Sequence, residues 1–448
     1  MKRSSWRYLW SAHDIRRKLL ITILLLAIYR LAAHVPVPGV DRAALQSIFQ
    51  AGATGSGLLN LLDLLSGGTV SSFSVLAMGV YPYITAQIIL QLLVPIIPAL
   101  QKRMEEDPRE GQKWMEKWTY ILAVPMAALQ GIGQINIFNQ LSGGVPIIQN
   151  FGFVPGSFIR SFAIILSMTA GTMFAIWLGE LISEFGIRNQ GLSLIIFAGI
   201  VSRLPANFRG LWADEQNRFF LIIFALVITA LTIFAIVFVQ QGRRNVPVMY
   251  PGRRMGNRMS MPVKGTLPLM VNMAGMIPLI FAQSLLTFPA ILASFFNKPT
   301  LSATVRNIAA SVQTMFGGTS NFYWVTYFIL VVVFTFFYTN VLFQQQNYGE
   351  NLKKVGAQIP GVSRGAPTQK YLNKVLSRIT LPGAFFLGIV AVLPWLLGLF
   401  IPILSQNENA LLISSAGLLI VVGVVRDAFF NIQAELKLHG YEDAMLIR

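Results

Sequence analysis

The feature that most constrains this chain is the repetition of long, uncharged, apolar runs. Stretches of about twenty such residues recur along the 448-residue sequence, and about twenty apolar residues are what an α-helix needs to cross a bilayer core ~30 Å thick. Only 12% of the residues are charged, whereas a soluble domain carries roughly twice that fraction. The sequence therefore predicts an all-α membrane protein that crosses the bilayer many times.

We expect ten membrane-spanning helices near residues 19–35, 73–97, 118–137, 161–179, 189–204, 219–240, 267–292, 322–343, 379–403 and 410–430. With the N-terminus inside, twenty-six of the 35 Lys and Arg residues fall in cytoplasmic segments, seven outside (counting Arg203, at the outer end of the fifth span) and two (Arg30 and Arg426) deeper within spans. Chance asymmetry explains such a ratio poorly, so the positive-inside rule predicts that both termini are cytoplasmic. The basic segment 1–18 is interpreted as a retained tail, because it has no apolar region followed by a cleavage site.

Two of the expected cytoplasmic loops are long and strongly basic. Residues 241–266 hold six Lys and Arg residues and no acid, and residues 345–378 hold six against Glu350. Topology alone accounts for part of this charge, but loops of this length exceed what a helical hairpin needs. Clustered arginines also favour docking to phosphate groups, RNA included, or to an acidic protein surface. The candidate docking residues are Arg243, Arg244, Arg253, Arg254, Arg258 and Arg364.

The chain has few residues of the kinds that carry covalent chemistry. It has no cysteine, three histidines, and no phosphate-binding loop or HExxH motif. Acidic residues are nearly absent from the spans, although Asp427 lies beside Arg426 and is expected to pair with it. We therefore expect no enzymatic activity, no metal and no cofactor, and the scarcity of buried carboxylates counts against an ion-coupled transporter.

The polar residues within the expected second and seventh spans are uncharged. They are Thr85, Gln87, Gln91, Asn272, Gln283 and Ser284. Such residues commonly hold membrane helices together at ~1 kcal/mol each, and the alternative is an interface that has to open. The same two spans contain Gly79 with Pro82 and Gly275 with Pro278, which are expected to permit bending.

A short apolar segment near residues 58–70 belongs to no span. Its "LLDLLSGG" core carries Asp63 and stops at Gly67 and Gly68 after about two turns, so it is too short to cross.

Several motifs resemble the SecY family, the central subunit of the bacterial protein-conducting channel. They are "VPVPGVD", "LLSGG", "GVYPYITAQIILQLL", "GTMFAIWLGELISEFGIRNQGLSLIIFAGIV", "VNMAGMIPLIFAQSLLTFPA" and "GYED", which together extend over nearly the whole chain. The resemblance implies two inverted five-helix halves around a central pore, here residues 1–215 and 216–448. It also implies that the short segment is the plug that closes the resting pore, with residues Leu61, Leu62, Asp63, Leu64, Leu65, Gly67 and Gly68.

The resemblance further assigns a pore ring of six apolar residues: Val80, Ile84, Leu192, Ile196, Ile280 and Ile420. Without it, each would be interpreted as an ordinary core residue. The lateral gate maps to the second and third spans facing the seventh and eighth, with Thr85, Gln91 and Asn272 as polar contacts. The second docking loop departs from the family pattern P-G-I-R-P-G. It reads "PGVSRGAP", with Ser363 at the usual arginine position and Arg364 after it.

The implied function is a passive channel in the bacterial plasma membrane, which passes unfolded preproteins with signal sequences across and releases apolar segments sideways into lipid. Energy would come from a partner, either the SecA ATPase or the ribosome, and SecE and SecG would be companion subunits. Two alternatives stay open. A secondary transporter predicts solute uptake by the isolated protein in vesicles, and a membrane scaffold without a pore predicts no ion leak from any mutation.

Overall fold

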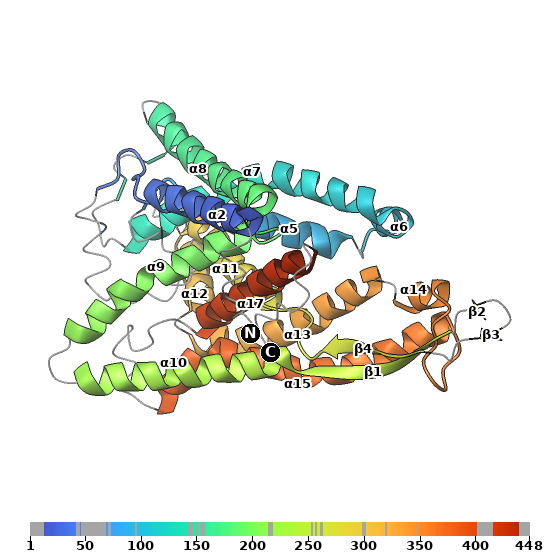
Figure 1. Cartoon of the computed structure of the whole chain (residues 1–448). Helices are drawn as coiled ribbons and strands as arrows, with labels where there is room; N and C mark the ends of the chain where they lie inside the picture. The colour runs from blue at the N-terminus through green and yellow to red at the C-terminus, as the bar shows by residue number, and fades with distance from the viewer. Residues whose placement is uncertain are drawn as a thin grey trace. The chain divides into compact units, whose positions relative to one another are not determined.

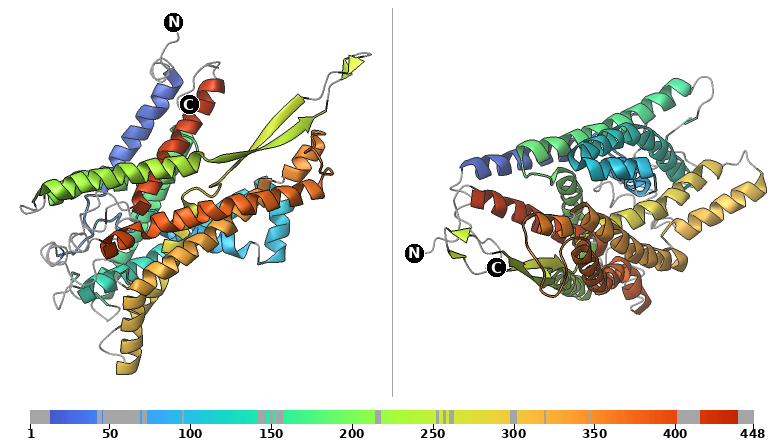
Figure 2. Two further views of the ribbon diagram at one scale, coloured as in Figure 1. Left: turned by 90° about the horizontal axis from the view of Figure 1, so that it is seen from below. Right: turned by 90° about the vertical axis from the view of Figure 1, so that its right-hand side faces the viewer.

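The computed structural model describes residues 13–41, 45, 69, 73–94, 96–141, 147–148, 151–152, 157–213, 218–251, 254–255, 258–259, 263–297, 302–318, 320–346, 348–400 and 415–438 (Figures 1 and 2). Most of these residues are helical. The helices are α2 (His13–Ala32), α5 (Tyr81–Leu93), α6 (Pro98–Glu106), α7 (Pro108–Leu141), α8 (Phe158–Phe185), α9 (Gly191–Ala213), α10 (Arg218–Gln241), α11 (Ile277–Phe296), α12 (Ala303–Phe316), α13 (Asn321–Gln346), α14 (Tyr348–Lys354), α15 (Ala366–Phe400) and α17 (Ser415–Leu438).

The helices confirm a polytopic membrane protein. Among the described residues, eight helices are long and apolar enough to cross a membrane, and a ninth span results if α5 and α6, bent by 97° at their junction, count as one. Each of the ten predicted spans overlaps a described helix. The first lies in α2, where Arg16, Arg17 and Lys18 occupy the start of the helix and leave a shorter apolar stretch.

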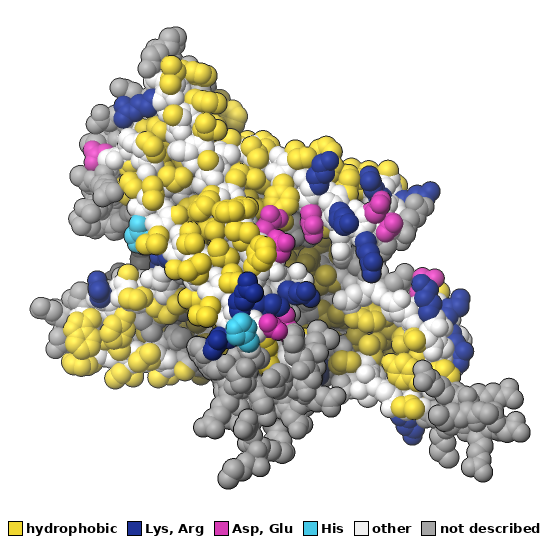
Figure 3. All heavy atoms as spheres, turned by 45° about the horizontal axis from the view of Figure 1, so that its top comes forward, with side chains coloured by type: hydrophobic (Ala, Val, Ile, Leu, Met, Phe, Trp, Pro, Cys, Tyr) yellow, Lys and Arg dark blue, Asp and Glu magenta, His cyan; other side chains and the backbone are white. Residues whose placement is uncertain are grey.

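On the face drawn in Figure 3, hydrophobic side chains cover most of the described surface of the helices, and charged side chains gather in a few patches. Phe234 and Phe238 of α10 are each more than 70% exposed. A soluble protein would bury aromatic side chains of this size, so the helix surface is suited to contact with lipid.

Two predicted spans begin later than expected. The span predicted at 73–97 becomes helical only at Tyr81, and the span predicted at 267–292 only at Ile277. Gly79 and Gly275 adopt left-handed backbone conformations (φ 52° and 63°) just before the two helices, and Pro82 and Pro278 fall in the first turns. Proline is tolerated there because its missing N–H would have no intrahelical partner. These residues, which were expected to permit bending, thus mark the starts of the two helices.

The chain packs into two compact units. Unit 1 comprises the described residues of Met1–Ile223, Gln283–Trp324 and Ile420–Arg448, and unit 2 those of Phe224–Ala282 and Val325–Leu419. Within unit 1, α7 packs against α5, α6 and α8, and α2 packs against α8 and α9.

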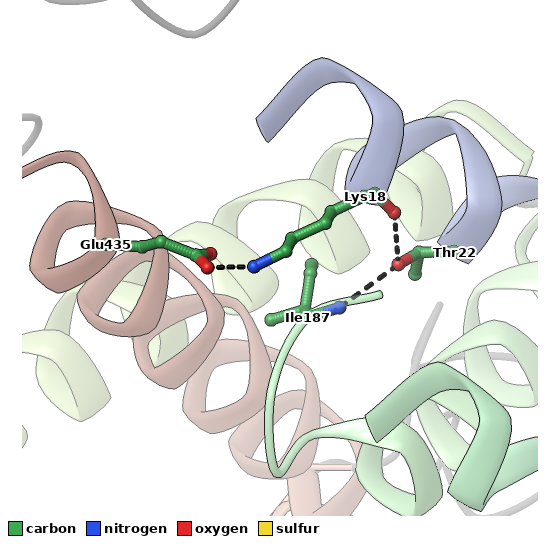
Figure 4. A network of polar contacts seen from close by, with 4 residues as sticks. All are labelled: Lys18, Thr22, Ile187 and Glu435. Carbon is green, nitrogen blue, oxygen red and sulfur yellow. Dashed lines mark hydrogen bonds and ion pairs between the residues drawn. The ribbon is translucent and has the colours of Figure 1, made fainter. Parts of the chain in front are cut away.

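The first and last described helices meet within unit 1 (Figure 4). The Lys18 ammonium of α2 pairs with the Glu435 carboxylate of α17. The Thr22 hydroxyl donates to the Lys18 carbonyl (2.9 Å) and accepts from the Ile187 backbone N–H (3.3 Å) in the turn between α8 and α9. The Asn431 side chain of α17 donates to a backbone carbonyl of the same turn (3.0 Å). These contacts join the first and last described helices to the turn between α8 and α9.

Unit 2 contains a β-hairpin where a loop was predicted. β1 (Arg243–Tyr250) pairs antiparallel with β4 (Val263–Met270), and the ribbon continues beyond the end of α10 (Figure 2). Val246 and Val248 point to the packed face of β1 while their neighbours are exposed. This alternation has the period of a half-buried strand. The prediction of a loop over 241–266 followed directly by a span is corrected accordingly.

The second basic segment packs onto this hairpin. Met249 and Gln358 exchange two backbone hydrogen bonds of 2.8 and 2.9 Å, and Ala357 and Ile359 join Val246 in one buried cluster. The helix α15 begins at Ala366, well before the predicted span at 379–403, and α14 precedes it. We call residues 243–270 and 348–378 together the basic module.

Two further findings concern single elements. The predicted ion pair near the inner end of the last span is confirmed, because Arg426 Nη2 lies 2.9 Å from Asp427 Oδ1. The helix α12 lies outside all ten predicted spans, and its fourteen residues fall between α11 and α13.

Candidate functional site at the starts of α5 and α11

The starts of α5 and α11 carry the same residue types at the same spacing. Each reads Gly-x-x-Pro-x-Ile-x-Ala-Gln, and the matching pairs are Gly79 and Gly275, Pro82 and Pro278, Ile84 and Ile280, Ala86 and Ala282, and Gln87 and Gln283. The repeat is visible in the sequence and could have indicated the two helix starts, which hydropathy alone does not report.

The two segments also share a local conformation. Both glycines have positive φ, and both helices begin two residues after the glycine. Ile84 and Ile280 are buried, 8% and 6% exposed, and each occupies the first turn of its own helix. The repeat therefore gives these two predicted pore-ring residues equivalent positions within their own units.

The other predicted ring residues lie on three elements of unit 1. Val80 is the residue before α5 and is buried, and Ile196 of α9 and Ile420 of α17 are buried as well. Leu192 is half-buried and packs against a cluster formed by Tyr83, Ala86, Ala123 and Ile176. Five ring residues thus belong to unit 1 and Ile280 to unit 2. Because five of the six residues are buried, these five do not face lipid. Burial does not separate a pore-ring residue from an ordinary core residue, since both would be buried.

A chain of polar contacts joins α5 to its neighbours in unit 1. The Tyr81 hydroxyl donates to the Ser284 carbonyl of α11 (3.2 Å). The Thr85 hydroxyl donates to the Tyr81 carbonyl (3.0 Å) and accepts from the Gln130 side chain of α7 (3.2 Å). Thr85, a predicted gate residue, thus lies against the third predicted span. Gln130 was not predicted, because an amide within a long helix has no distinctive spacing.

The helices α7 and α11 approach each other closely at one glycine. A Cβ atom at Gly133 would lie 2.4 Å from Ile291 Cγ2, and the Ser294 hydroxyl donates to the Gly133 carbonyl at 3.4 Å. A cavity of ≈ 10 Å³ beside this contact is lined by Ala77, Met78, Tyr81, Gln130, Gln134 and Ile291. That volume suits about one water molecule, and the lining amides supply polar partners for it.

The other two predicted gate residues are not part of these contacts. Asn272 is buried before the start of α11 and donates to the Gly275 carbonyl (3.1 Å), so it stabilises the turn that precedes the helix. Gln91 is half-buried near the end of α5. Asn272 therefore precedes the seventh helix, although it was predicted to lie within the span.

The predicted plug residues, Leu61 to Gly68, lie outside the described part of the chain. Thr69, which follows them, is buried, and its hydroxyl donates to the Leu76 carbonyl at 2.6 Å.

Five of the six predicted docking arginines belong to described elements of the basic module. Arg243 and Arg244 are exposed on β1, and Arg364 is exposed in the turn before α15. Arg254 and Arg258 belong to the short paired strands β2 (Arg254–Met255) and β3 (Arg258–Met259), and Arg253 lies outside the described residues. The module thus holds part of both basic segments on one small folded scaffold.

These features define a class: a polytopic helical membrane protein with a structured basic module and a repeated helix start. Among its described residues, no group of three His, Asp or Glu side chains is placed to hold a metal ion. A model of the SecY family matches residues 74–429. The chain belongs to the SecY family.

Full-length relatives agree with this assignment. The chain is 36% identical to the protein translocase subunit SecY of Streptomyces scabiei, with 96% of each chain covered. It is 37% identical to the subunit of the same name from Aquifex aeolicus, with 97% of each covered. The Thermus thermophilus subunit is 36% identical over 97% of this chain and 96% of its own.

Two solved structures share the fold. One, described as a protein-conducting channel, is similar with a TM-score of 0.62 at 17% identity, covering 94% of this chain and 92% of that one. The other, with a TM-score of 0.62 at 18% identity and the same coverage, comes from work on the plug domain of SecY and the closed state of the translocation channel.

Proposed function

We propose that this chain is the protein-conducting channel of a bacterial plasma membrane. It passes unfolded preproteins across the bilayer and releases apolar segments laterally into lipid. Membership of the SecY family supports the activity, because the relatives are protein translocase subunits. The observation that carries the proposal is the repeated start of α5 and α11, which gives Ile84 and Ile280 the same position in two helices.

The repeat supports an architecture of two inverted halves, residues 1–215 and 216–448, with a pore between them. Val80, Ile84, Leu192, Ile196, Ile280 and Ile420 form the pore ring. Branched apolar side chains at one depth exclude water and ions, because water makes too few hydrogen bonds between them to remain. The segment from Leu61 to Gly68 closes the pore from outside.

The lateral gate opens between α5 and α7 on one side and α11 and α13 on the other. Few contacts with α11 support this role. They include one hydrogen bond, from Tyr81 of α5 to Ser284, and the close apolar approach of Gly133 of α7 to Ile291. Hydrogen bonds between membrane helices contribute only ~0.6–2 kcal/mol. A signal sequence can therefore replace such contacts with its own apolar surface at small cost.

The energy source is external, either the SecA ATPase or the ribosome, and both dock on the cytoplasmic basic module. SecE and SecG complete the complex, and both termini of this chain are cytoplasmic. The exposed arginines of β1 and of the turn before α15 support docking to an acidic or phosphate-bearing surface. Arg364 supplies the guanidinium that the family usually carries at the position of Ser363.

Depletion of the protein in its host tests the activity. Precursors of secreted proteins should accumulate in the cytoplasm with their signal sequences uncleaved, and re-expression of the chain should restore processing. Normal processing in depleted cells would contradict the proposal. Solute uptake by the purified protein in vesicles, without any preprotein, would favour a transporter.

A further inference from the structure

The helix α12 has one apolar and one polar side, and it is not a membrane span. Fourteen residues at ~1.5 Å each give a length of ~21 Å, too short for a bilayer core of ~30 Å. Val305, Ile308, Val312 and Met315 recur at helical spacing and form its apolar stripe. Thr304, Asn307, Ser311 and Thr314 form the polar face and are exposed.

Contacts with both neighbouring helices fix the rotation of α12 about its own axis. The Asn297 side chain, just after α11, donates to Gln313 Oε1 at 2.8 Å. Phe316 at the end of α12 meets Phe322 of α13 edge-on, with ring centroids 5.8 Å apart. All of these residues belong to unit 1. Gln313 and Phe316 therefore fix the side of α12 that packs against its neighbours. The apolar stripe lies on the adjacent side of the helix.

The stripe stays largely uncovered within the described structure. Val305, Ile308 and Met315 are 39%, 61% and 46% exposed. The neighbouring ends of the membrane helices are also apolar and exposed, since Phe296 of α11 is 55% and Phe322 of α13 is 47% exposed. The stripe thus continues the lipid-facing surface of the two helices that α12 connects.

We propose that α12 lies in the membrane interface, with its apolar stripe inserted among the lipids and its polar face in water. Helices of this kind lie in the plane of the bilayer surface with the apolar side buried between headgroups and acyl chains. The occupant of the stripe is lipid, because the stripe joins the lipid-facing ends of α11 and α13. Arg306 and the absence of acidic residues in 302–318 suit a surface that carries phosphate groups.

In this position, α12 anchors the outer end of α11, the helix that carries Ile280. The proposal requires that α11 and α13 cross the membrane, but it does not require that the chain conducts protein.

Single-cysteine labelling tests the proposal directly, because the natural chain contains no cysteine. Ile308→Cys and Met315→Cys probe the stripe, and Asn307→Cys and Ser311→Cys are matched controls on the polar face. Each full-length variant is labelled with a nitroxide and reconstituted in vesicles of phosphatidylethanolamine and phosphatidylglycerol. Collision rates are then measured with oxygen, which concentrates in lipid, and with a neutral nickel chelate, which stays in water.

We expect the ratio of oxygen to nickel collision rates to be at least about fivefold higher at the two stripe positions than at the two control positions. Equally low ratios on the two faces would place α12 in water, and equally high ratios would place both faces in lipid; either result would overturn the proposal. Stripe labels shielded from both reagents would also overturn it, because a protein surface rather than lipid would then cover the stripe. Substitution of exposed side chains leaves Gln313 and Phe316, which hold the helix, unchanged.

Discussion

Two glycines in α7, two residues apart, differ in the space available for a side chain. At Gly133 an added methyl group would lie 2.4 Å from Ile291 of α11, whereas at Gly131 the nearest atom would be Met168 Sδ at 3.8 Å. The first position has no room for a side chain, and the second has ordinary contact distance. The pair therefore separates an effect on the α7–α11 contact from an effect on α7 itself.

Replacement of Gly133 by Ala should force α7 and α11 apart. Overpacking of this kind typically costs about 1–3 kcal/mol, and in a lateral gate the cost falls on the closed state. We expect preproteins with weakened signal sequences to be translocated better, measured as processed product in an in vitro assay. Gly131→Ala should leave the preference for strong signals unchanged. If both variants behave like the natural chain, the α7–α11 contact does not restrain the gate.

Residue types alone predicted some of the polar site residues but not which residues they contact. The amides of the predicted spans were visible as polar residues in apolar runs, but their partners were not. Thr85 bonds to Gln130, and that pairing depends on how α5 and α7 cross. Asn272 looked like a span residue because its neighbours are apolar, although Gly275 shifts the helix start beyond it.

At the scale of elements, the basic module shows how a segment between spans becomes a folded structure. Val246 and Val248 pack into a core with Phe343, Leu372 and Leu376, at the base of α13 and α15. The strands β1 and β4 are thus held by the helices that leave the membrane beside them. The strands β1 and β4 thus form a rigid support, and a rigid support reduces the entropy lost when a partner binds.

Charge reversal at the tip of the hairpin tests its docking role. Arg254→Glu combined with Arg258→Glu should weaken binding of the SecA ATPase or the ribosome, and the residual binding should depend less on salt because exposed ion contacts are screened. Affinity measured by light scattering at low and high salt gives both quantities. The uncharged pair Arg254→Gln and Arg258→Gln should show an intermediate loss. Unchanged affinity of the reversed variant at low salt would remove the docking role.

A second prediction at the scale of elements concerns the contact between α2 and α17. Lys18→Cys with Glu435→Cys should be joined by a short bifunctional maleimide cross-linker, since the long Lys18 and Glu435 side chains meet in the structure while two Cys side chains at these positions are too short to bond directly. Arg17→Cys with Glu435→Cys is the control, because residue 17 points about 100° away from residue 18 on the helix. The cross-link is read as a mobility shift on gels, and the absence of any other cysteine keeps the result simple. Equal cross-linking of both pairs would contradict the packing of α2 against α17.

Among the described residues, a helix could be placed near each of the ten predicted spans, because a membrane span needs a long apolar run and such runs have few other causes. The hairpin was missed because its basic residues matched the charge expected of a cytoplasmic loop. The helix α12 was missed because its apolar residues occupy only one side and never form a run. The start of α5 and of α11 depended on one backbone conformation at a glycine, which hydropathy does not report.

For the whole molecule, we propose above all that Ile84 and Ile280 face a common pore. The two residues occupy the same position in repeated segments, and both are buried. An inverted pair of halves places equivalent positions at opposite depths about the membrane mid-plane, so Ile84 and Ile280 share a depth if both lie close to the mid-plane. A ring of such side chains keeps water and ions out while a polypeptide can still push them aside.

Single-channel recording in a planar bilayer tests this claim most directly. Ile84→Asn with Ile280→Asn supplies hydrogen-bonding groups at the constriction, so we predict ion conductance where the natural chain is tight, and a larger conductance when residues 61–67 are also deleted. Ile135→Asn with Ile182→Asn buries two amides elsewhere in the core and should lower stability, by a few kcal/mol at most per unsatisfied group, without opening a path for ions. A folded Ile84/Ile280 variant that stays as ion-tight as the natural chain, with and without residues 61–67, would contradict the claim.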